Sequence, residues 1–256
     1  MIDMSYKPAS MEIWDCVEAF RAKRPHVHCI TNAVAQHFTA NVLLAAGATP
    51  SMTIALSEVP SFVAHADALL VNLGTLDADR IAASEAAIKV AIESSKPWAL
   101  DPVFVHVSPE RLSVAKHFLE FHPALIRCNL DEASSLFGCG AELSGLAAFS
   151  DVGRVLAVTG QTDHVIAGPD RIAVNNGHPH MARITAMGCA LNAVLAGFVA
   201  AHENQALAVT AGLALFGIAG EVAGERAEGP GTFVPHFLDA LAGMEENRFL
   251  ERLQIT

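Results

Sequence analysis

Short apolar runs alternate with longer amphipathic segments along most of the chain. Apolar positions in residues 11–24 recur at helical spacing, whereas residues 68–73 form a continuous apolar run, as in a strand buried on both faces. Similar patterns predict strands at 25–30, 48–54, 97–100, 124–129, 154–159 and 164–168, and helices at 33–46, 58–65, 78–95, 109–120, 130–137 and from 189 onward. This alternation predicts right-handed βαβ units, and therefore an α/β fold of three α/β/α layers with a mostly parallel central sheet.

No linker, internal repeat or charge run interrupts this pattern, so we expect residues 1–256 to form a single domain. Gly47 is typical of a helix end, and Thr31-Asn32 is typical of a polar turn that caps the helix at 33–46. Pro50 predicts a sheet edge or an interruption, because proline cannot donate to a strand ladder. The apolar segments 184–201 and 206–219 are rich in Gly, Ala, Thr and Asn, which favours core helices over membrane spans.

Composition narrows the range of partners. The formal net charge of −11 argues against nucleic acid, whose phosphates need clustered Lys and Arg, but it allows a nucleotide held by a few local groups and Mg²⁺. The 5 cysteines are odd in number and contain no C-x-x-C pair, which favours a reducing compartment. The first ten residues contain no apolar leader, so we expect a cytoplasmic protein without a membrane partner.

Polar residues stand where the predicted strands end, and in parallel sheets ligands bind at the carboxyl ends of strands. Asp101 and Glu132 follow neighbouring strands, and two such carboxylates suit Mg²⁺, which prefers oxygen ligands. Other interpretations stay open: Asp101 can cap a turn, and Asn129 with Glu132 can simply begin a helix. Further polar or glycine signals occur at Asn72 to Thr75, Thr159-Gly160 and Thr185 to Cys189.

Arg127 lies one residue inside a strand end, where an arginine is awkward in a core and useful as a clamp on a nucleotide phosphate. Thr159-Gly160 is either an ordinary strand-to-turn junction or a hydroxyl and backbone group near such a phosphate. The turn before the predicted helix at 190–202 can hold a phosphate with its free N–H groups, although a buried helix after a tight turn gives the same pattern.

Cys189 stands at the start of that helix. A helix N-terminus lowers the pKa of a thiol, so Cys189 could accept a proton from a substrate hydroxyl. The alternative is a lone buried cysteine that acts as an inert small hydrophobe. Phosphoryl transfer needs mainly positioning and charge neutralisation, so even a weak base would serve.

The order and spacing of short motifs between His26 and Leu241 resemble hydroxyethylthiazole kinase, the thiamin-salvage member of the ribokinase-like superfamily. The motifs are His28-Cys29-Ile30-Thr31-Asn32, Phe38-Thr39-Ala40-Asn41, Asn72-Leu73-Gly74-Thr75-Leu76, Leu100-Asp101-Pro102-Val103, Arg127-x-Asn129-x-x-Glu132, Val158-Thr159-Gly160, Asn176-Gly177-His178-Pro179, Gly188-Cys189, Gly217-Ile218-Ala219-Gly220-Glu221 and Gly229-Pro230-Gly231-Thr232-Phe233. The resemblance implies a ribokinase-like fold and ATP-dependent phosphorylation of the hydroxyethyl arm of 4-methyl-5-(2-hydroxyethyl)thiazole. It also implies Mg²⁺ and a homotrimer with active sites between subunits.

Site residues follow from the resemblance by position. It implies that Met52, Ala186 and Asn32 lie on the thiazole side. It implies that Arg127, Thr159 and Asn129 contact ATP. It also implies that Asp101 and Glu132 bind the metal. It also implies that Gly188 and Cys189 form the anion hole and the catalytic position, which sugar kinases of the superfamily fill with an aspartate. The resemblance thus implies that Cys189 and Gly188 are catalytic, that Met52, Ala186 and Asn32 bind the substrate, that Arg127, Thr159 and Asn129 bind ATP, and that Asp101 and Glu132 bind the metal.

Two segments depart from the family pattern. The family usually has Gly-Thr-Gly-Cys or Gly-Ala-Gly-Cys where this chain has Ala186-Met187-Gly188-Cys189, and alanine adopts a positive φ only at a cost. The family usually has Gly-Val-Gly-Ala where this chain has Phe104-Val105-His106-Val107. Two alternatives to an active thiazole kinase therefore remain: a related small-molecule alcohol kinase with another acceptor, and a catalytically impaired homologue that binds the nucleotide or the thiazole.

Overall fold

An eight-stranded sheet runs through the computed structural model, which describes residues 8–138, 146 and 154–256. Its spatial order is β2-β1-β3-β4-β5-β6-β7-β8. The strands β1 to β6 pair in parallel and the β6–β7 and β7–β8 pairs are antiparallel, so the prediction of a mostly parallel sheet is confirmed. The strands are β1 His26–Ile30, β2 Thr49–Ser51, β3 Ala68–Asn72, β4 Trp98–Asp101, β5 Leu125–Asn129, β6 Val155–Thr159, β7 Asp163–Ala167 and β8 Asp170–Val174.

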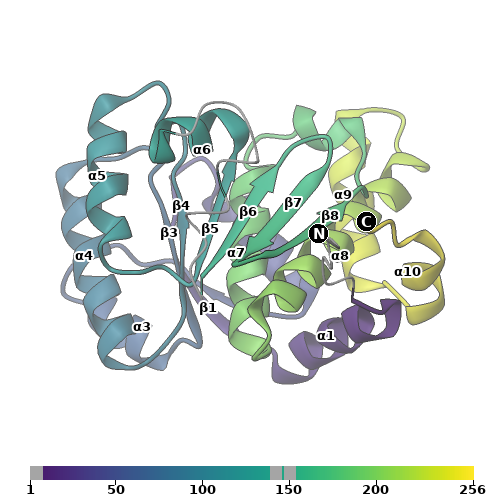
Figure 1. Cartoon of the computed structure of the whole chain (residues 1–256), viewed down its shortest axis with the longest axis horizontal. Helices are drawn as coiled ribbons and strands as arrows, with labels where there is room; N and C mark the ends of the chain where they lie inside the picture. The colour runs from purple at the N-terminus through teal and green to yellow at the C-terminus, as the bar shows by residue number, and fades with distance from the viewer. Residues whose placement is uncertain (1–7, 139–145, 147–153) are drawn as a thin grey trace.

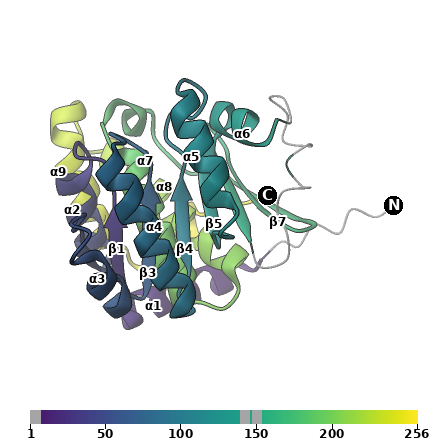
Figure 2. The ribbon, with the colours of Figure 1, turned by 90° about the vertical axis from the view of Figure 1, so that its left-hand side faces the viewer.

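Helices cover both faces of the sheet, which confirms the three-layer architecture (Figures 1 and 2). One face carries α3 Val59–His65, α4 Ala78–Glu93, α5 Pro109–Leu119 and α6 Leu130–Phe137. The other face carries α1 Ser10–Lys23, α2 Gln36–Ala46, α7 Met187–Ala201, α8 Gln205–Gly224, α9 Pro230–Ala242 and α10 Glu246–Arg252. A short 3₁₀ helix, η2 Pro179–Arg183, connects β8 to α7.

The apolar run at 68–73 gives β3, and every residue of this strand is buried. Its successive side chains alternate between the two hydrophobic cores, because strand residues point to opposite faces in turn. Leu70 joins the core with α1, α7 and α8, whereas Leu69 and Val71 join the core with α3, α4 and α5. The continuous apolar pattern is therefore the result of burial on both sides.

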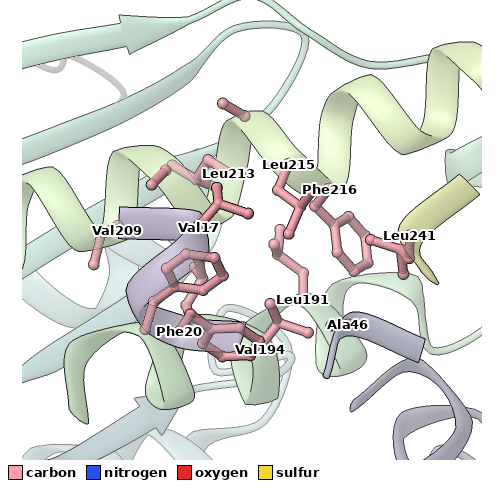
Figure 3. Close-up of a cluster of buried hydrophobic side chains, with 14 of the residues drawn as sticks. Val17, Phe20, Ala46, Leu191, Val194, Val209, Leu213, Leu215, Phe216 and Leu241 are labelled. Atoms are coloured by element: carbon pink, nitrogen blue, oxygen red, sulfur yellow. The ribbon is translucent and has the colours of Figure 1, made fainter. Parts of the chain in front are cut away.

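The helices α7 and α8 form the centre of one core. Figure 3 shows Leu191 and Val194 of α7 and Leu213 of α8 packed with Val17 and Phe20 of α1. Among the described residues, α8 is the one helix long and apolar enough to cross a membrane, and 89% of its apolar window is buried inside the protein. Both helices therefore pack as core helices of this fold.

Some predicted boundaries need correction. The second helix begins at Gln36 and not at 33, because residues 33–35 form a turn in which Oδ1 of Asn32 accepts a hydrogen bond from the N–H of Ala35 at 3.0 Å. The helix expected from residue 189 or 190 begins earlier, at Met187. The strand with Pro50 spans Thr49–Ser51 and lies at the edge of the sheet, as predicted.

Gly197 allows α7 to approach α1 and β1 closely. A Cβ atom on Gly197 would lie 2.8 Å from Cε2 of Phe20 and 3.2 Å from Cγ2 of Val27. The Phe20 ring cannot easily move away, because it stacks on the Phe198 ring with 4.2 Å between centroids. The position of α7 against the sheet thus depends on the missing side chain.

Gly197→Ala tests this packing. We expect it to lower the free energy of unfolding by about 1–3 kcal/mol, because an extra methyl group in a close-packed core forces its neighbours to shift. The measurement is equilibrium unfolding in urea. The matched control is Gly231→Ala in α9, where a Cβ atom would meet no heavy atom within 4 Å. Equal stabilities of the two variants would contradict this account of the packing.

Candidate active site at the carboxyl edge of the sheet

Three strand ends meet the start of α7 in a network of hydrogen bonds. Asn72 ends β3 beside Asp101, which ends β4, and Nδ2 of Asn72 donates to Oδ2 of Asp101 at 2.6 Å. Asn32, just after β1, donates from Nδ2 to Oδ1 of Asn72 at 3.1 Å. The Nδ2 atoms of Asn32 and Asn72 each lie 3.3 Å from Sγ of Cys189. The network therefore holds the Cys189 thiol and the Asp101 carboxylate in one fixed arrangement.

Asn72 is the residue that joins these groups, and the sequence had indicated it only as one polar strand end among several. Its Oδ1 also accepts a hydrogen bond from the N–H of Gly74 at 2.9 Å. A Cβ atom on Gly74 would lie 2.7 Å from Cβ of Asn32, so glycine is needed for this turn. An amide that ends a fully buried strand two residues before a glycine is the signal that points to such a residue.

Asp101 is completely buried, and burial raises its pKa to about 7 from an ordinary 3.8; Arg127 opposes the rise and Glu132 adds to it. The folded protein thus holds the proton of the Asp101 carboxyl group more tightly than the unfolded chain does. The contribution of Asp101 therefore lowers the free energy of unfolding as the pH rises from about 4 to about 7. Asn72 and Asn192 both lie close enough to Asp101 to lower its pKa, but no described residue makes a hydrogen bond of ordinary geometry to its Oδ1. A cation bound at Oδ1 would offset the free-energy cost of burying the carboxylate and of leaving this oxygen without a partner. The side chain is therefore suited to be a metal ligand.

Glu132 has a structural role at the start of α6. Its Oε2 accepts from the N–H of Asn129 at 2.9 Å, and Oδ1 of Asn129 accepts from the N–H of Glu132 at 2.8 Å, which forms a capping box. Its Oε1 accepts from the N–H of Phe104 at 2.9 Å. Glu132 therefore ties α6 to the loop after Asp101, and each of its oxygens keeps a further lone pair for a ligand.

The described residues hold no cluster of three His, Cys, Asp or Glu side chains that could bind a metal by themselves. Mg²⁺ does not require such a cluster, because it usually keeps several waters and takes one or two carboxylates together with substrate phosphates. Asp101, with its unpartnered buried oxygen, and Glu132, which follows the neighbouring strand, match that donor set.

The pKa of the Cys189 thiol is raised to about 12, so the prediction that the helix start would lower it is wrong. Burial is the largest cause and the negative charge of Asp101 is the next. The amide donors Asn32 and Asn72, with the more distant Arg127, act in the opposite direction but are outweighed. Near neutral pH the side chain is thus a protonated thiol.

The two segments that depart from the family pattern both contain a non-glycine residue with left-handed backbone. Ala186, just before α7, has φ 69° and ψ 5°, and Phe104 has φ 59°. A glycine adopts this conformation without strain, whereas a residue with a Cβ atom does so at a cost. The chain therefore keeps at both positions a backbone that suits glycine.

Arg127 lies against the first turn of α7. Its Nη2 donates to Oγ1 of Thr159 at 2.5 Å. A Cβ atom on Gly188 would lie 2.7 Å from Nη1 of Arg127, so the guanidinium can occupy this place only beside glycine. Nε of Arg127 is buried and no described residue accepts a hydrogen bond from it. A charged fork with an unpaired buried donor at a helix N-terminus suits a phosphate.

A cavity of about 830 Å³ opens beside this arginine. Its polar wall includes Arg127, Asn129, Thr159 and Gly188, so the structure brings together the residues expected to contact ATP. Its apolar lining comes from α7 and α8: Met187, Leu191, Leu213, Phe216 and Gly217. The lining combines many polar side chains with an apolar patch, which suits a polar small molecule that carries an apolar part.

Two of the three residues expected on the thiazole side, Ala186 and Asn32, lie at or beside the start of α7, whereas Met52 is not among the residues that line the cavity. Ala186 and Cys189 flank Gly188 at the start of α7, and Asn32 contacts Cys189 directly. Met52 follows directly after β2, is half-buried and packs against the core that contains α1 and α7. The first turn of α7 thus has the cavity on one side and the polar network of Asn32, Asn72, Asp101 and Cys189 on the other.

Asp163 is a cavity residue that sequence reasoning missed. Its Oδ1 accepts from the N–H of Gly160 at 2.9 Å, which closes the turn between β6 and β7. Burial raises its pKa to about 6. Asp and Gly three residues apart between two strands are a recognisable turn signal, but the burial of the carboxylate follows only from the folded hairpin.

Comparisons with known proteins agree on one family. The model of the hydroxyethylthiazole kinase family matches residues 17–247. A probable hydroxyethylthiazole kinase of Agrobacterium fabrum (strain C58) is 40% identical over 248 residues, which cover 97% of this chain and 96% of the relative. A solved structure of hydroxyethylthiazole kinase from Pyrococcus horikoshii OT3 superposes with a TM-score of 0.89 and 34% identity, covering 95% of this chain and 98% of that one.

More distant structures share the fold alone. A ribokinase-like superfamily protein of Enterococcus faecalis V583 has a TM-score of 0.69 at 12% identity, covering 94% of this chain and 96% of that one. The prediction of a ribokinase-like α/β/α fold is therefore confirmed.

Thiol reactivity tests the state of Cys189. At pH 8 we expect iodoacetamide to modify Cys189 roughly 50-fold more slowly than a free cysteine, because almost all of the thiol is protonated. The rate should still be rising above pH 10. The measurement is peptide mass spectrometry across a pH series, with Cys189→Ser as the blank. A reaction midpoint below pH 8 would show that the thiolate is stabilised after all.

Ala186→Gly tests the strain at the start of α7. We expect the substitution to raise the free energy of unfolding by about 0.5–1 kcal/mol, because the left-handed backbone suits glycine. The same substitution at Ala201, the last residue of α7, should lower it by a similar amount. Both values come from urea unfolding, and a loss of stability in Ala186→Gly would contradict the strain.

Proposed function

The chain belongs to the hydroxyethylthiazole kinase family, and from this premise we propose that it transfers the γ-phosphoryl group of ATP to the hydroxyl of 4-methyl-5-(2-hydroxyethyl)thiazole, a step of thiamin salvage. The observation that carries the proposal is the first turn of α7, where the cavity beside Arg127 meets the polar network that contains Cys189 and Asp101. A donor site and an acceptor site must adjoin in this way for direct transfer.

We propose that the cavity binds ATP. Arg127, Thr159 and Asn129 are the proposed polar contacts, and the apolar wall of Leu213 and Phe216 accommodates the base. Arg127 and the first turn of α7, with Met187 and Gly188, both line the cavity and are the groups proposed to hold the phosphates. These donors stabilise the transition state most, because extra negative charge develops on the phosphates during transfer.

We propose that Asp101 and Glu132 hold Mg²⁺, which when bound neutralises charge on the phosphates of the nucleotide. The buried, unpartnered Oδ1 of Asp101 supports this role, because a cation there would offset the cost of its burial. The hydrogen bond from Phe104 to Glu132 fixes the loop that follows Asp101, so the same carboxylate also keeps the metal-binding edge in shape.

We propose that Cys189 positions the acceptor hydroxyl, with Asn32, Met52 and Ala186 on the thiazole side. Because the thiol keeps its proton near neutral pH, its part is to orient the hydroxyl by hydrogen bonding and not to remove its proton. The left-handed backbone at Ala186 supports an intact anion hole at Gly188, since the turn keeps the conformation that glycine would give it.

We also propose that residues 1–256 are one kinase domain of a cytoplasmic homotrimer that needs no membrane or nucleic acid partner. One sheet extends from β2 to β8 and supports the single domain. Exposed apolar side chains around β1 and β2 support an interface between subunits: Val34 at 65%, Leu44 at 59%, Leu56 at 55% and Phe62 at 40%.

The test is product formation by purified protein with MgATP and the thiazole alcohol, followed as ADP release and by mass spectrometry of the thiazole phosphate. We expect Arg127→Met to raise the KM for ATP at least about tenfold, because a charged hydrogen bond contributes about 1.5–3 kcal/mol. The matched control is Arg248→Met on the exposed face of α10, which makes the same charge change on the surface. A protein that binds both substrates and forms no thiazole phosphate would overturn the proposed function.

A further inference from the structure

Asn176 is a buried amide in the wall of the cavity, and every hydrogen-bonding atom of its side chain is used. Nδ2 donates to Oε1 of Glu221 at 2.9 Å and to the carbonyl oxygen of Arg252 at 2.7 Å. Oδ1 accepts from the N–H of Gln254 at 2.9 Å. A single side chain in the wall thus connects to α8 and to the segment that follows α10.

The segment 252–256 forms an additional antiparallel pairing along β8. The N–H of Thr256 donates to the carbonyl oxygen of Ala173 at 2.9 Å, and the N–H of Ala173 donates back at 2.8 Å. The N–H of Asn175 donates to the carbonyl oxygen of Gln254 at 2.9 Å. Figure 1 shows the end of the chain between β8 and α10, away from β4, the strand that ends at Asp101.

Glu221 fixes the next residue of the wall. Its Oε1 also accepts from the N–H of Gly177 at 3.1 Å, so one carboxylate oxygen holds two consecutive residues, Asn176 and Gly177. The backbone of Asn176 presses on α8, since a Cβ atom on Gly217 would lie 2.6 Å from the Asn176 carbonyl oxygen. The residues that line the cavity here are therefore positioned by groups outside it.

We propose that Asn176, Glu221 and the segment 252–256 form a clamp that positions the 175–179 wall of the cavity for the phosphate donor. The proposal rests on the proposed function, because it takes the cavity to be the nucleotide site. The clamp has no hydrogen bond to Asn32, Asn72, Asp101 or Cys189 among those described, so its effect falls on nucleotide binding. Asn176 and Glu221 are then positioning residues, and residue 254 acts through its backbone.

Gln254→Pro removes the one N–H that binds Asn176 and leaves the carbonyl oxygen that accepts from Asn175. We expect the KM for ATP and the dissociation constant for ADP, measured by calorimetry, to rise about fivefold to tenfold, since one hydrogen bond to a wall residue is lost. The kcat and the KM for the thiazole alcohol should stay within about twofold. Amide hydrogen exchange at Gly177 should accelerate in the same variant.

Ile255→Pro is the matched control. Ile255 lies opposite Val174 in a non-hydrogen-bonded pair of the antiparallel pairing. Its N–H therefore makes no hydrogen bond to β8. The Ile255 side chain packs against the core, so we expect Ile255→Pro to lower the melting temperature, but the Gln254 N–H that binds Asn176 is kept, so ATP binding and Gly177 exchange should match the wild type. Deletion of residues 253–256 should raise the KM for ATP more than Gln254→Pro does, because it removes the whole pairing with β8.

Three results would overturn the clamp. One is a wild-type affinity for ADP in Gln254→Pro, with or without faster exchange at Gly177. Another is an equal effect of Ile255→Pro. The third is a parallel loss of kcat, both KM values and the melting temperature, which would indicate a general structural role. A wild-type protein that binds no ADP would instead overturn the proposed function, and the clamp with it.

Discussion

The close approach of the Arg127 guanidinium to the backbone of Gly188 is the contact on which both parts of the site depend. It places a fixed positive charge at the N-terminus of α7, where the helix already offers unpaired N–H groups. The direction of α7 is set by its burial between the sheet and α8, and Gly197 brings it close to α1. The apolar helix thus positions its own polar first turn, and the turn separates the cavity from the Asn72 network.

The site keeps features that are unfavourable for stability alone. Asp101 is buried with an open oxygen, and its pKa near 7 shows that the ionised form is disfavoured in the folded protein. Ala186 and Phe104 hold left-handed backbone without being glycine. Such costs are tolerated where the surrounding structure fixes the conformation, as the hydrogen bond between Glu132 and Phe104 does here. Stability and function therefore make opposite demands on the same few residues.

The sequence predicted most of the architecture, because periodicity and chain breaks are local signals. The buried run of β3 and the edge position of Pro50 were readable from the residues alone. What depends on register between strands was not readable. Asn72 becomes the centre of the polar network only because β3 and β4 align it with Asp101, and the pKa of Cys189 depends on how deeply the folded network buries the thiol.

The departures from the family pattern show why a changed residue type need not mean a changed site. Phe104 has the same backbone conformation that a glycine would adopt there, and 57% of its surface is exposed, so its bulk is directed largely toward solvent. Met187 is 6% exposed and belongs both to the core and to the cavity wall. Its bulk therefore lies on the cavity side of the first turn of α7, whereas Cys189 faces the Asn32 and Asn72 amides. A substitution in the first turn of α7 thus acts on the cavity or on the polar network according to which of the two its side chain faces.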